Sequence, residues 1–235
     1  LGAIGYGLHI GYRAMARSKR FTLQTIHLSG NRKVSRKELL AFAGIEMKMP
    51  LMAIDPPVVA KRIAKHPWVK ECNVQRTLPS SLSIEVTERV ARAVLAVDAL
   101  YLVDDDGELF KRALPAHARQ YPIISGLDRV FYTTQKEHAH HMVAKAIEFA
   151  EEFSSLRPMG KEVNLAEIHI DRYTGYEVEV TPGPWRLHLG WNGLLARCRR
   201  GKWIIDELKR RGKHPRIVYL DNERKPQRVV VRLDR

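Results

Sequence analysis

Residues able to bind metals are few and scattered in this 235-residue chain. Three histidines, His138, His140 and His141, lie near the start of an amphipathic segment, where His138 and His141 are one helical turn apart. Such a pair offers two imidazoles to a metal ion, but neither the H-E-x-x-H spacing nor a nearby pair of carboxylates accompanies it. We therefore expect no metal site there.

The cysteines and the acidic run also have simple structural interpretations. Cys72 and Cys198 are far apart and belong to no C-x-x-C or Cys/His metal spacing, and Cys72 fits a small core residue on a strand. The run 104–106 before Gly107 resembles part of a calcium loop, but position 102, where an oxygen ligand is required, is leucine. We interpret the run as a solvated turn.

The sequence contains no G-x-S-x-G motif, no P-loop and no metal cluster, so we expect neither an enzyme nor a bound cofactor. The net charge of +14 favours an anionic partner, which can be nucleic acid, lipid headgroups or an acidic protein. A recognition helix or an aromatic RNA-binding strand is not evident, which disfavours nucleic acid. The basic clusters 197–202 and 209–213 share one helical pattern, which is typical of a solvated face.

The N-terminal segment 1–12 is apolar and glycine-rich, and Arg13, Arg17, Lys19 and Arg20 follow it. Twelve residues are too few to cross a bilayer, which needs about 20. We interpret residues 1–20 as the C-terminal end of a transmembrane helix or signal anchor with its juxtamembrane segment. An uncleaved or disordered leader is the alternative.

Residues 21–90 have the pattern strand, helix, helix, strand, strand. Residues 21–30 predict the first strand, and Ser35 with Glu38 forms a capping box for a helix that ends at Gly44. Asp55-Pro56 begins a second helix. The two alternating apolar runs of 68–92 predict a half-buried β-hairpin. This order predicts a small α+β domain in which helices cover one face of a three-stranded sheet.

Residues 91–235 predict a second domain that is mainly antiparallel sheet with two helices. The helical patterns are 136–153 and 194–212, and strand patterns precede, separate and follow them. The last two strands are expected at 216–220 and 227–233. The overall fold class is therefore α+β.

Several positions together resemble the FtsQ/DivIB family of bacterial cell division proteins. The hairpin resembles the end of that family's POTRA domain, and two later segments resemble its next hairpin and its Pro-x-Ile-x-Gly stretch. The matching residues are Trp68-Val69, Val74, Arg76, Pro79, Leu82, Ile84, Val86, Glu88-Arg89, Leu102-Val103-Asp104, Gly107, Phe110, Pro122, Ile124 and Gly126. Ala91 and Glu223-Arg224 depart from the family pattern.

The resemblance implies a single-pass protein of the inner membrane with periplasmic domains, located at the division septum and without catalysis. It implies binding of the FtsB–FtsL pair through the β domain, and of other division proteins through the POTRA domain and the membrane helix. The expected domains are 1–20, 21–90 and 91–235. A POTRA module of outer-membrane assembly or secretion is the alternative, although it predicts repeated POTRA units or a barrel.

The resemblance also implies that the partner adds a strand to the last strand of the sheet. The apolar residues at 229–231 suit an edge strand, although a strand in the sheet interior would have the same pattern. Pro226 cannot donate to a strand ladder, so we expect pairing beyond it. The candidate partner-binding residues are Tyr219, Gln227, Arg228, Val229, Val230, Val231 and Arg232, and Arg228 and Arg232 suit an acidic partner.

Overall fold

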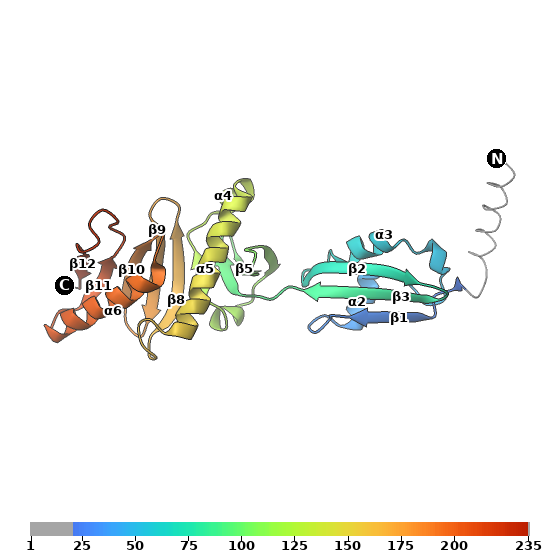
Figure 1. Cartoon of the computed structure of the whole chain (residues 1–235), viewed down its shortest axis with the longest axis horizontal. Coiled ribbons are helices and arrows are strands. Elements are labelled where there is room, and N and C mark those ends of the chain that lie inside the picture. The colour runs from blue at the N-terminus through green and yellow to red at the C-terminus, as the bar shows by residue number, and fades with distance from the viewer. Residues whose placement is uncertain (1–20, 235) are drawn as a thin grey trace. The chain divides into compact units, whose positions relative to one another are not determined.

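The computed structural model describes residues 21–234 (Figure 1). The chain divides into two compact units, of which the first ends at Val90 and the second begins at Ala91, and each has its own hydrophobic core. Within residues 21–234, no helix is long and apolar enough to span a bilayer. The membrane helix predicted at residues 1–20 lies outside the described residues.

The first unit has the predicted element order. Its sheet has the order β1-β3-β2, in which β1 is parallel and β2 antiparallel to the central strand β3. The elements are β1 (Thr25–Ser29), α2 (Arg36–Ala43), the 3-10 turn η2 (Leu51–Ala53), α3 (Pro56–Ile63), β2 (Val69–Thr77) and β3 (Ser81–Glu88).

Local capping explains where α2 begins and ends. The Ser35 hydroxyl accepts the Glu38 N–H at 3.2 Å, and the Glu38 carboxylate accepts the Ser35 N–H at 3.0 Å. This confirms the capping box. Gly44 then ends α2 in the left-handed conformation. Asp55 precedes α3 as predicted, but its side chain makes no capping hydrogen bond.

The hairpin β2–β3 supplies the core of the first unit with the predicted alternation. Leu82, Ile84 and Val86 of β3 are buried, and Leu39 of α2 and Ile63 of α3 belong to the same buried cluster. Burying one apolar face of a three-stranded sheet under two helices removes enough apolar surface from water to stabilise a small domain.

The end of β3 also holds the loop before α2. The Glu88 carboxylate accepts the backbone N–H groups of Lys33 and Val34, each at 2.8 Å, and that of Arg32 at 3.0 Å. Partial burial raises the pKa of Glu88, but the three hydrogen bonds outweigh that effect and lower it below its usual value.

We expect Glu88→Gln to reduce the pH dependence of stability. Because the folded-state pKa is lowered, the stabilising contribution is present above the unfolded-state pKa of about 4.3 and is lost as the pH falls through the folded-state value. The variant should be less stable by about 1 kcal/mol at pH 6 and close to wild type at pH 2. Chemical unfolding at the two pH values measures this, and an equal deficit at both would contradict it.

The second unit is one nine-stranded sheet with the order β12-β11-β10-β9-β8-β7-β4-β5-β6. Its elements are β4 (Ala93–Ala96), β5 (Leu100–Val103), β6 (Leu109–Arg112), the 3-10 turn η3 (His117–Arg119), β7 (Ile123–Ser125), α4 (Arg129–Thr134), α5 (Lys136–Leu156), β8 (Asn164–Asp171), β9 (Gly175–Thr181), β10 (Trp185–Gly190), α6 (Leu194–Arg210), β11 (Pro215–Tyr219) and β12 (Val230–Leu233).

Antiparallel pairs predominate in the second sheet, as predicted, but the sheet also contains parallel pairs and the unit has a third, short helix, neither of which was predicted. The pairs β4–β7, β7–β8 and β10–β11 are parallel, and the other five pairs are antiparallel. Helices connect β7 to β8 and β10 to β11, and such crossovers return the chain parallel to its starting strand. The third helix, α4, is short and rich in β-branched and aromatic residues, so its helix propensity is weak.

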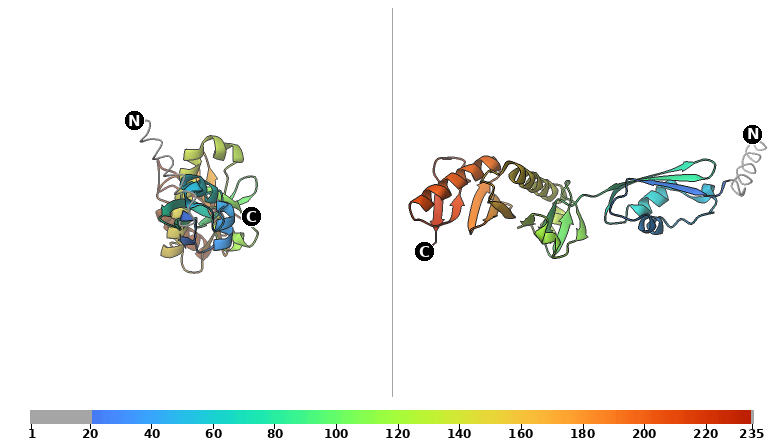
Figure 2. Two further views of the ribbon diagram at one scale, coloured as in Figure 1. Left: turned by 90° about the vertical axis from the view of Figure 1, so that its right-hand side faces the viewer. Right: turned by 90° about the horizontal axis from the view of Figure 1, so that it is seen from below.

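The helices α5 and α6 lie over the same face of the second sheet, as the right-hand view of Figure 2 shows. The predicted apolar stripe of α5 is buried, including Met142, Ile147 and Phe153. The buried Tyr176 hydroxyl donates to the Met142 carbonyl oxygen at 2.9 Å. A satisfied hydroxyl in the core fixes how α5 sits on β9.

Candidate protein-interaction edge

The predicted last strand lies at an end of the second sheet. β12 pairs antiparallel with β11, with Val230 opposite Tyr219, Val231 opposite Val218 and Arg232 opposite Ile217. Within the described residues, β12 ends the strand order, so its second side is not covered by another strand (Figure 1). Such an edge presents N–H and C=O groups to any extended chain that approaches.

The two faces of β12 differ in burial. Val229 and Val231 pack against the core, together with the fully buried Val218 of β11. Val230, by contrast, is 65% exposed. The strand is therefore fixed to the core through one face, which holds its free edge in a defined position.

The strand begins at Val230, three residues later than predicted. The Arg228 N–H donates to the Lys225 carbonyl oxygen at 2.9 Å, and the Lys225 N–H donates to Asn222 Oδ1 at 3.0 Å. These bonds close a turn around Pro226, so Gln227 and Arg228 belong to the turn rather than to the sheet. Val229 lies between the turn and the strand.

The N–H groups of β12 alternate between the two sides of the strand. The Asp234 N–H donates to the His214 carbonyl oxygen at 2.9 Å, which is on the side of β11. The register shift opposite Arg232 and Leu233 places its extra residue in β11, so N–H directions along β12 still repeat every second residue, and those of Val230 and Arg232 also point toward β11. Those of Val231 and Leu233 point away from the sheet, toward an approaching chain.

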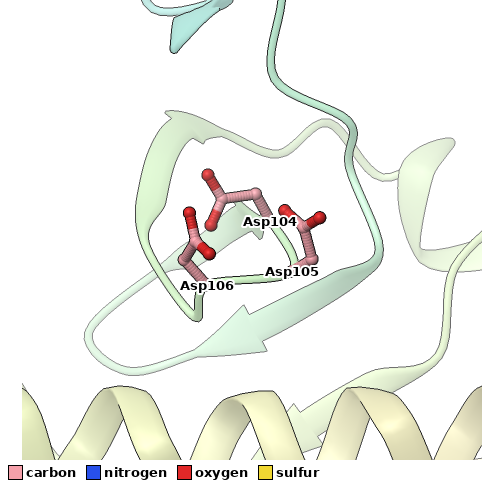
Figure 3. A group of neighbouring side chains, drawn as sticks. All are labelled: Asp104, Asp105 and Asp106. Atoms are coloured by element: carbon pink, nitrogen blue, oxygen red, sulfur yellow. The ribbon is translucent and has the colours of Figure 1, made fainter. Parts of the chain in front are cut away.

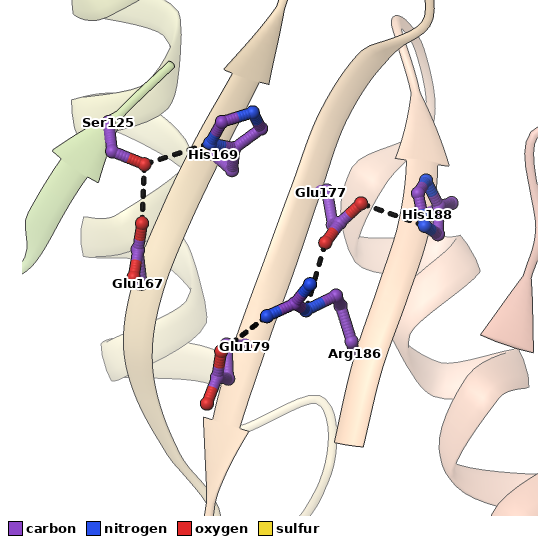
Figure 4. A network of polar contacts seen from close by, with 7 residues as sticks. All are labelled: Ser125, Glu167, His169, Glu177, Glu179, Arg186 and His188. Atoms are coloured by element: carbon purple, nitrogen blue, oxygen red, sulfur yellow. Dashed lines mark hydrogen bonds and ion pairs between the residues drawn. The ribbon is translucent and has the colours of Figure 1, made fainter. Parts of the chain in front are cut away.

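The outer face of the sheet next to this edge carries an ordered polar network (Figure 4). The rings of Tyr219 and His188 stack with centroids 4.4 Å apart, and His188 Nε2 lies 2.7 Å from Glu177. Arg186 bridges Glu177 at 3.0 Å and Glu179 at 3.3 Å. Cross-strand pairs of this kind stabilise a sheet face that no helix covers.

The network continues across β8 to β7, where the Ser125 hydroxyl donates to Glu167 and lies 2.9 Å from His169 Nδ1 (Figure 4). In a catalytic triad the carboxylate orients the histidine, whereas here both Glu167 and His169 contact the serine hydroxyl. Burial raises the pKa of Glu177, but its hydrogen bond from His188 outweighs that effect and lowers the pKa.

The edge is bordered by basic side chains. A hollow of about 280 Å³ on the outer face is lined by Glu179, Pro184, Arg186, Arg216, Ile217 and Arg232. Arg216 is 3.8 Å from Asp234, whereas Arg228 and Arg232 make no ion pair with any residue of 21–234. A partner strand with acidic side chains would therefore meet unpaired positive charge along this edge.

The structure brings most of the predicted residues together. Tyr219 and the β12 residues Val230 to Arg232 lie on paired strands, and Gln227 to Val229 lead into them. The polar network was not predicted as a site, although Arg186 and His188 alternate with apolar residues in the sequence. Glu177 and Glu179 alternate with apolar residues on β9 in the same way. These two alternations together were the sequence signal that could have revealed the polar network.

The other groups considered for chemistry have structural roles. The acidic run is only partly a solvated turn: Asp105 and Asp106 are exposed, but Asp104 is fully buried (Figure 3). Asp104 Oδ1 accepts the Glu108 N–H at 2.9 Å, so the carboxylate shapes the turn that leads into β6. The three carboxylates are close together, yet acidic groups at a turn need no ion.

Among residues 21–234, no histidine or cysteine belongs to a group of side chains that could hold a metal ion. His138 packs against the Phe131 ring with centroids 5.8 Å apart. Cys72 is partly buried in the core of the first unit, as predicted, and Cys198 is buried in that of the second. Burial raises the pKa of the Cys198 thiol to about 12, which makes it unreactive.

The β-α-α-β-β unit and its sheet order place the chain in the class of POTRA-containing proteins. Residues 21–89 match the model of the POTRA domain, FtsQ-type. The chain is 31% identical to the cell division protein FtsQ of Myxococcus fulvus over 223 aligned residues. The aligned region covers 92% of this chain and 75% of that protein.

Two further relatives carry the same name. The chain is 28% identical to FtsQ of Anaeromyxobacter sp. (strain K), over 99% of this chain and 79% of that protein. It is also 28% identical to FtsQ of Syntrophotalea carbinolica, over 92% of this chain and 76% of that protein. The chain belongs to the family of the cell division protein FtsQ, which confirms the resemblance and disfavours the alternative of an outer-membrane assembly module.

Proposed function

We propose that this chain is a non-catalytic scaffold of bacterial cell division that recruits other division proteins to the septum. In this proposal, residues 1–20 end a helix anchored in the inner membrane, and both units lie in the periplasm. The POTRA unit and the membrane helix contact other division proteins, and the second unit binds the FtsB–FtsL pair by strand addition to β12. Family membership and the geometry of the edge support it.

The single observation that carries the proposed interface is the open side of β12. The N–H groups of Val231 and Leu233 point away from β11, while Val231 is fixed against the core. An edge that is held in place loses little conformational entropy when a second strand pairs with it. Tyr219, Val230 and Arg232 lie on the outer face, where they can contact alternate side chains of the added strand.

Proline at position 231 tests this interface most selectively. Val231→Pro removes an N–H that points toward the partner and keeps an apolar side chain against the core. We expect the affinity for the FtsB–FtsL pair to fall at least about tenfold, since a backbone hydrogen bond is lost and the ring obstructs the partner strand. Titration of the full chain with purified FtsB–FtsL measures this.

Two matched variants make the result specific. Val231→Ala trims the same side chain but keeps the N–H, so it should bind much more tightly than Val231→Pro. Val230→Pro removes an N–H that points toward β11, and should therefore loosen β12 itself, which circular dichroism and thermal unfolding report. If folded Val231→Pro binds as tightly as Val231→Ala, strand addition at β12 is wrong.

A further inference from the structure

The strand β7, which lies between β4 and β8 in the second sheet, is shorter than β8, so the pairing between these strands stops early and leaves a gap at this end of β7. β4, β7 and β8 are adjacent and parallel, but β7 has only three residues and its pairing with β8 begins at Ile123 and Glu167. Before Pro122 the chain turns away into η3. The residues preceding β4 and the first residues of β8, Asn164 to Ala166, therefore extend past the end of the strand between them.

This gap coincides with a cavity of about 660 Å³. Ala91 and Arg92 line one side, Asn164 to Ala166 line the other, and Ala150, Phe153 and Ser154 of α5 belong to its lining. Neighbouring strands lie about 5 Å apart, so two strands that flank an unfilled position are about 10 Å apart. One extended chain fits between them. We define these residues, with 118–122, as the strand slot.

The charge of the strand slot favours an anionic ligand. Arg92, Arg119 and Arg157 line it together with one acid, Glu151, which is 3.3 Å from Arg92. Arg157 Nη1 donates to Asn164 Oδ1 at 3.1 Å, and Arg119 makes no ion pair with any residue of 21–234. Guanidinium groups recognise carboxylates through paired, charge-assisted hydrogen bonds.

The backbone at Arg157 adds an independent observation. Arg157 ends α5 in the left-handed conformation with φ of 47°, where glycine is the usual residue. A residue with a side chain costs about 1–2 kcal/mol in that conformation. An arginine at this position therefore lowers the stability of the helix end, and backbone strain of this kind is common at functional positions.

We propose that the strand slot binds an extended acidic segment of a partner protein. The segment lies where β7 would continue between β4 and β8, and its carboxylates contact Arg119 and Arg157. The width of the slot favours an extended polypeptide, and its excess of arginine favours acidic side chains. The slot is a second interaction surface, and it does not depend on the proposed role of β12.

The test is a titration of the full isotope-labelled chain with an eight-residue peptide of alternating glutamate and valine, followed by NMR. We expect concentration-dependent shifts at the amides of Asn164, Leu165 and Ala166. The double variant Arg119→Gln with Arg157→Gly should bind at least about tenfold more weakly. It should stay folded, since glycine suits the left-handed conformation. Arg199→Gln with Arg200→Gln removes equal charge from α6 and should bind like wild type.

Each other outcome overturns the proposal. Absence of shifts at Asn164 to Ala166, or equal shifts with a lysine–valine peptide, would exclude recognition of an acidic segment. Equal binding by the slot and α6 double variants would mean that the arginines of the slot are not responsible. If acetate alone produced the same shifts at the same carboxylate concentration, the slot would be a simple anion site.

Discussion

The variant Gly30→Ala is expected to unfold the POTRA unit while leaving the second unit folded. Gly30 has φ of +84°, and a Cβ added there would overlap the backbone carbonyl oxygen of Val86 on the central strand β3. The left-handed conformation costs about 1–2 kcal/mol for alanine, and overpacking against backbone adds about 1–3 kcal/mol. A unit of this size has only roughly 3–10 kcal/mol of stability, so a loss of about 2–5 kcal/mol removes a large part of it.

Gly44→Ala is the matched control within the same unit. Gly44 is also left-handed, with φ of +63°, but an added Cβ would meet only the flexible end of Arg62, 3.1 Å away. It should cost about 1–2 kcal/mol, for the conformation alone. In NMR spectra, the resonances of the POTRA unit should collapse for Gly30→Ala and persist for Gly44→Ala. Equal stability of the two variants would contradict the packing of Gly30 against β3.

Phe153→Ala is expected to destabilise the second unit by about 3–5 kcal/mol. Phe153 is 1% exposed in the core under α5, and its ring meets that of Phe149 edge to face with centroids 5.8 Å apart. Removing it leaves a cavity that the rigid sheet fills only partly. Urea unfolding followed by resonances of the second unit gives the free energy of unfolding.

Leu156→Ala is the matched control on the same helix, because Leu156 lies outside the hydrophobic core. Leu156 is 56% exposed near the end of α5, so its truncation should cost less than about 0.5 kcal/mol. If Phe153→Ala and Leu156→Ala had similar effects, the burial of α5 against the sheet would be wrong. Because the two units have separate cores, we expect Gly30→Ala to retain FtsB–FtsL binding and Phe153→Ala to weaken it.

Much of the POTRA unit could be predicted because its determinants are local. The capping box at Ser35, the glycine at the end of α2 and the alternation of β3 each depend on residues close in sequence. Glu88 was recognised only as part of a family pattern. Its role in holding residues 32–34 joins positions more than 50 residues apart, which sequence spacing does not reveal.

The second unit was predicted less completely because its strand order depends on long connections. The spacing of apolar residues identifies α5 and α6, but it does not determine which strands the connections through these helices place side by side. Asp104 shows the same limit: a run of three acids predicts exposure, whereas the turn into β6 buries the first of them. In the candidate edge, Val230 and Arg232 were predicted as partner-binding residues, but which N–H groups face the partner follows only from the register with β11.

Amide hydrogen exchange at β12 tests the proposed interface most directly. In the free chain, the N–H groups of Val231 and Leu233 should exchange faster than those of Val230 and Arg232, which point toward β11. Saturating FtsB–FtsL should slow exchange at Val231 and Leu233 at least about tenfold. Unchanged exchange at both amides in the fully bound chain would contradict strand addition at β12.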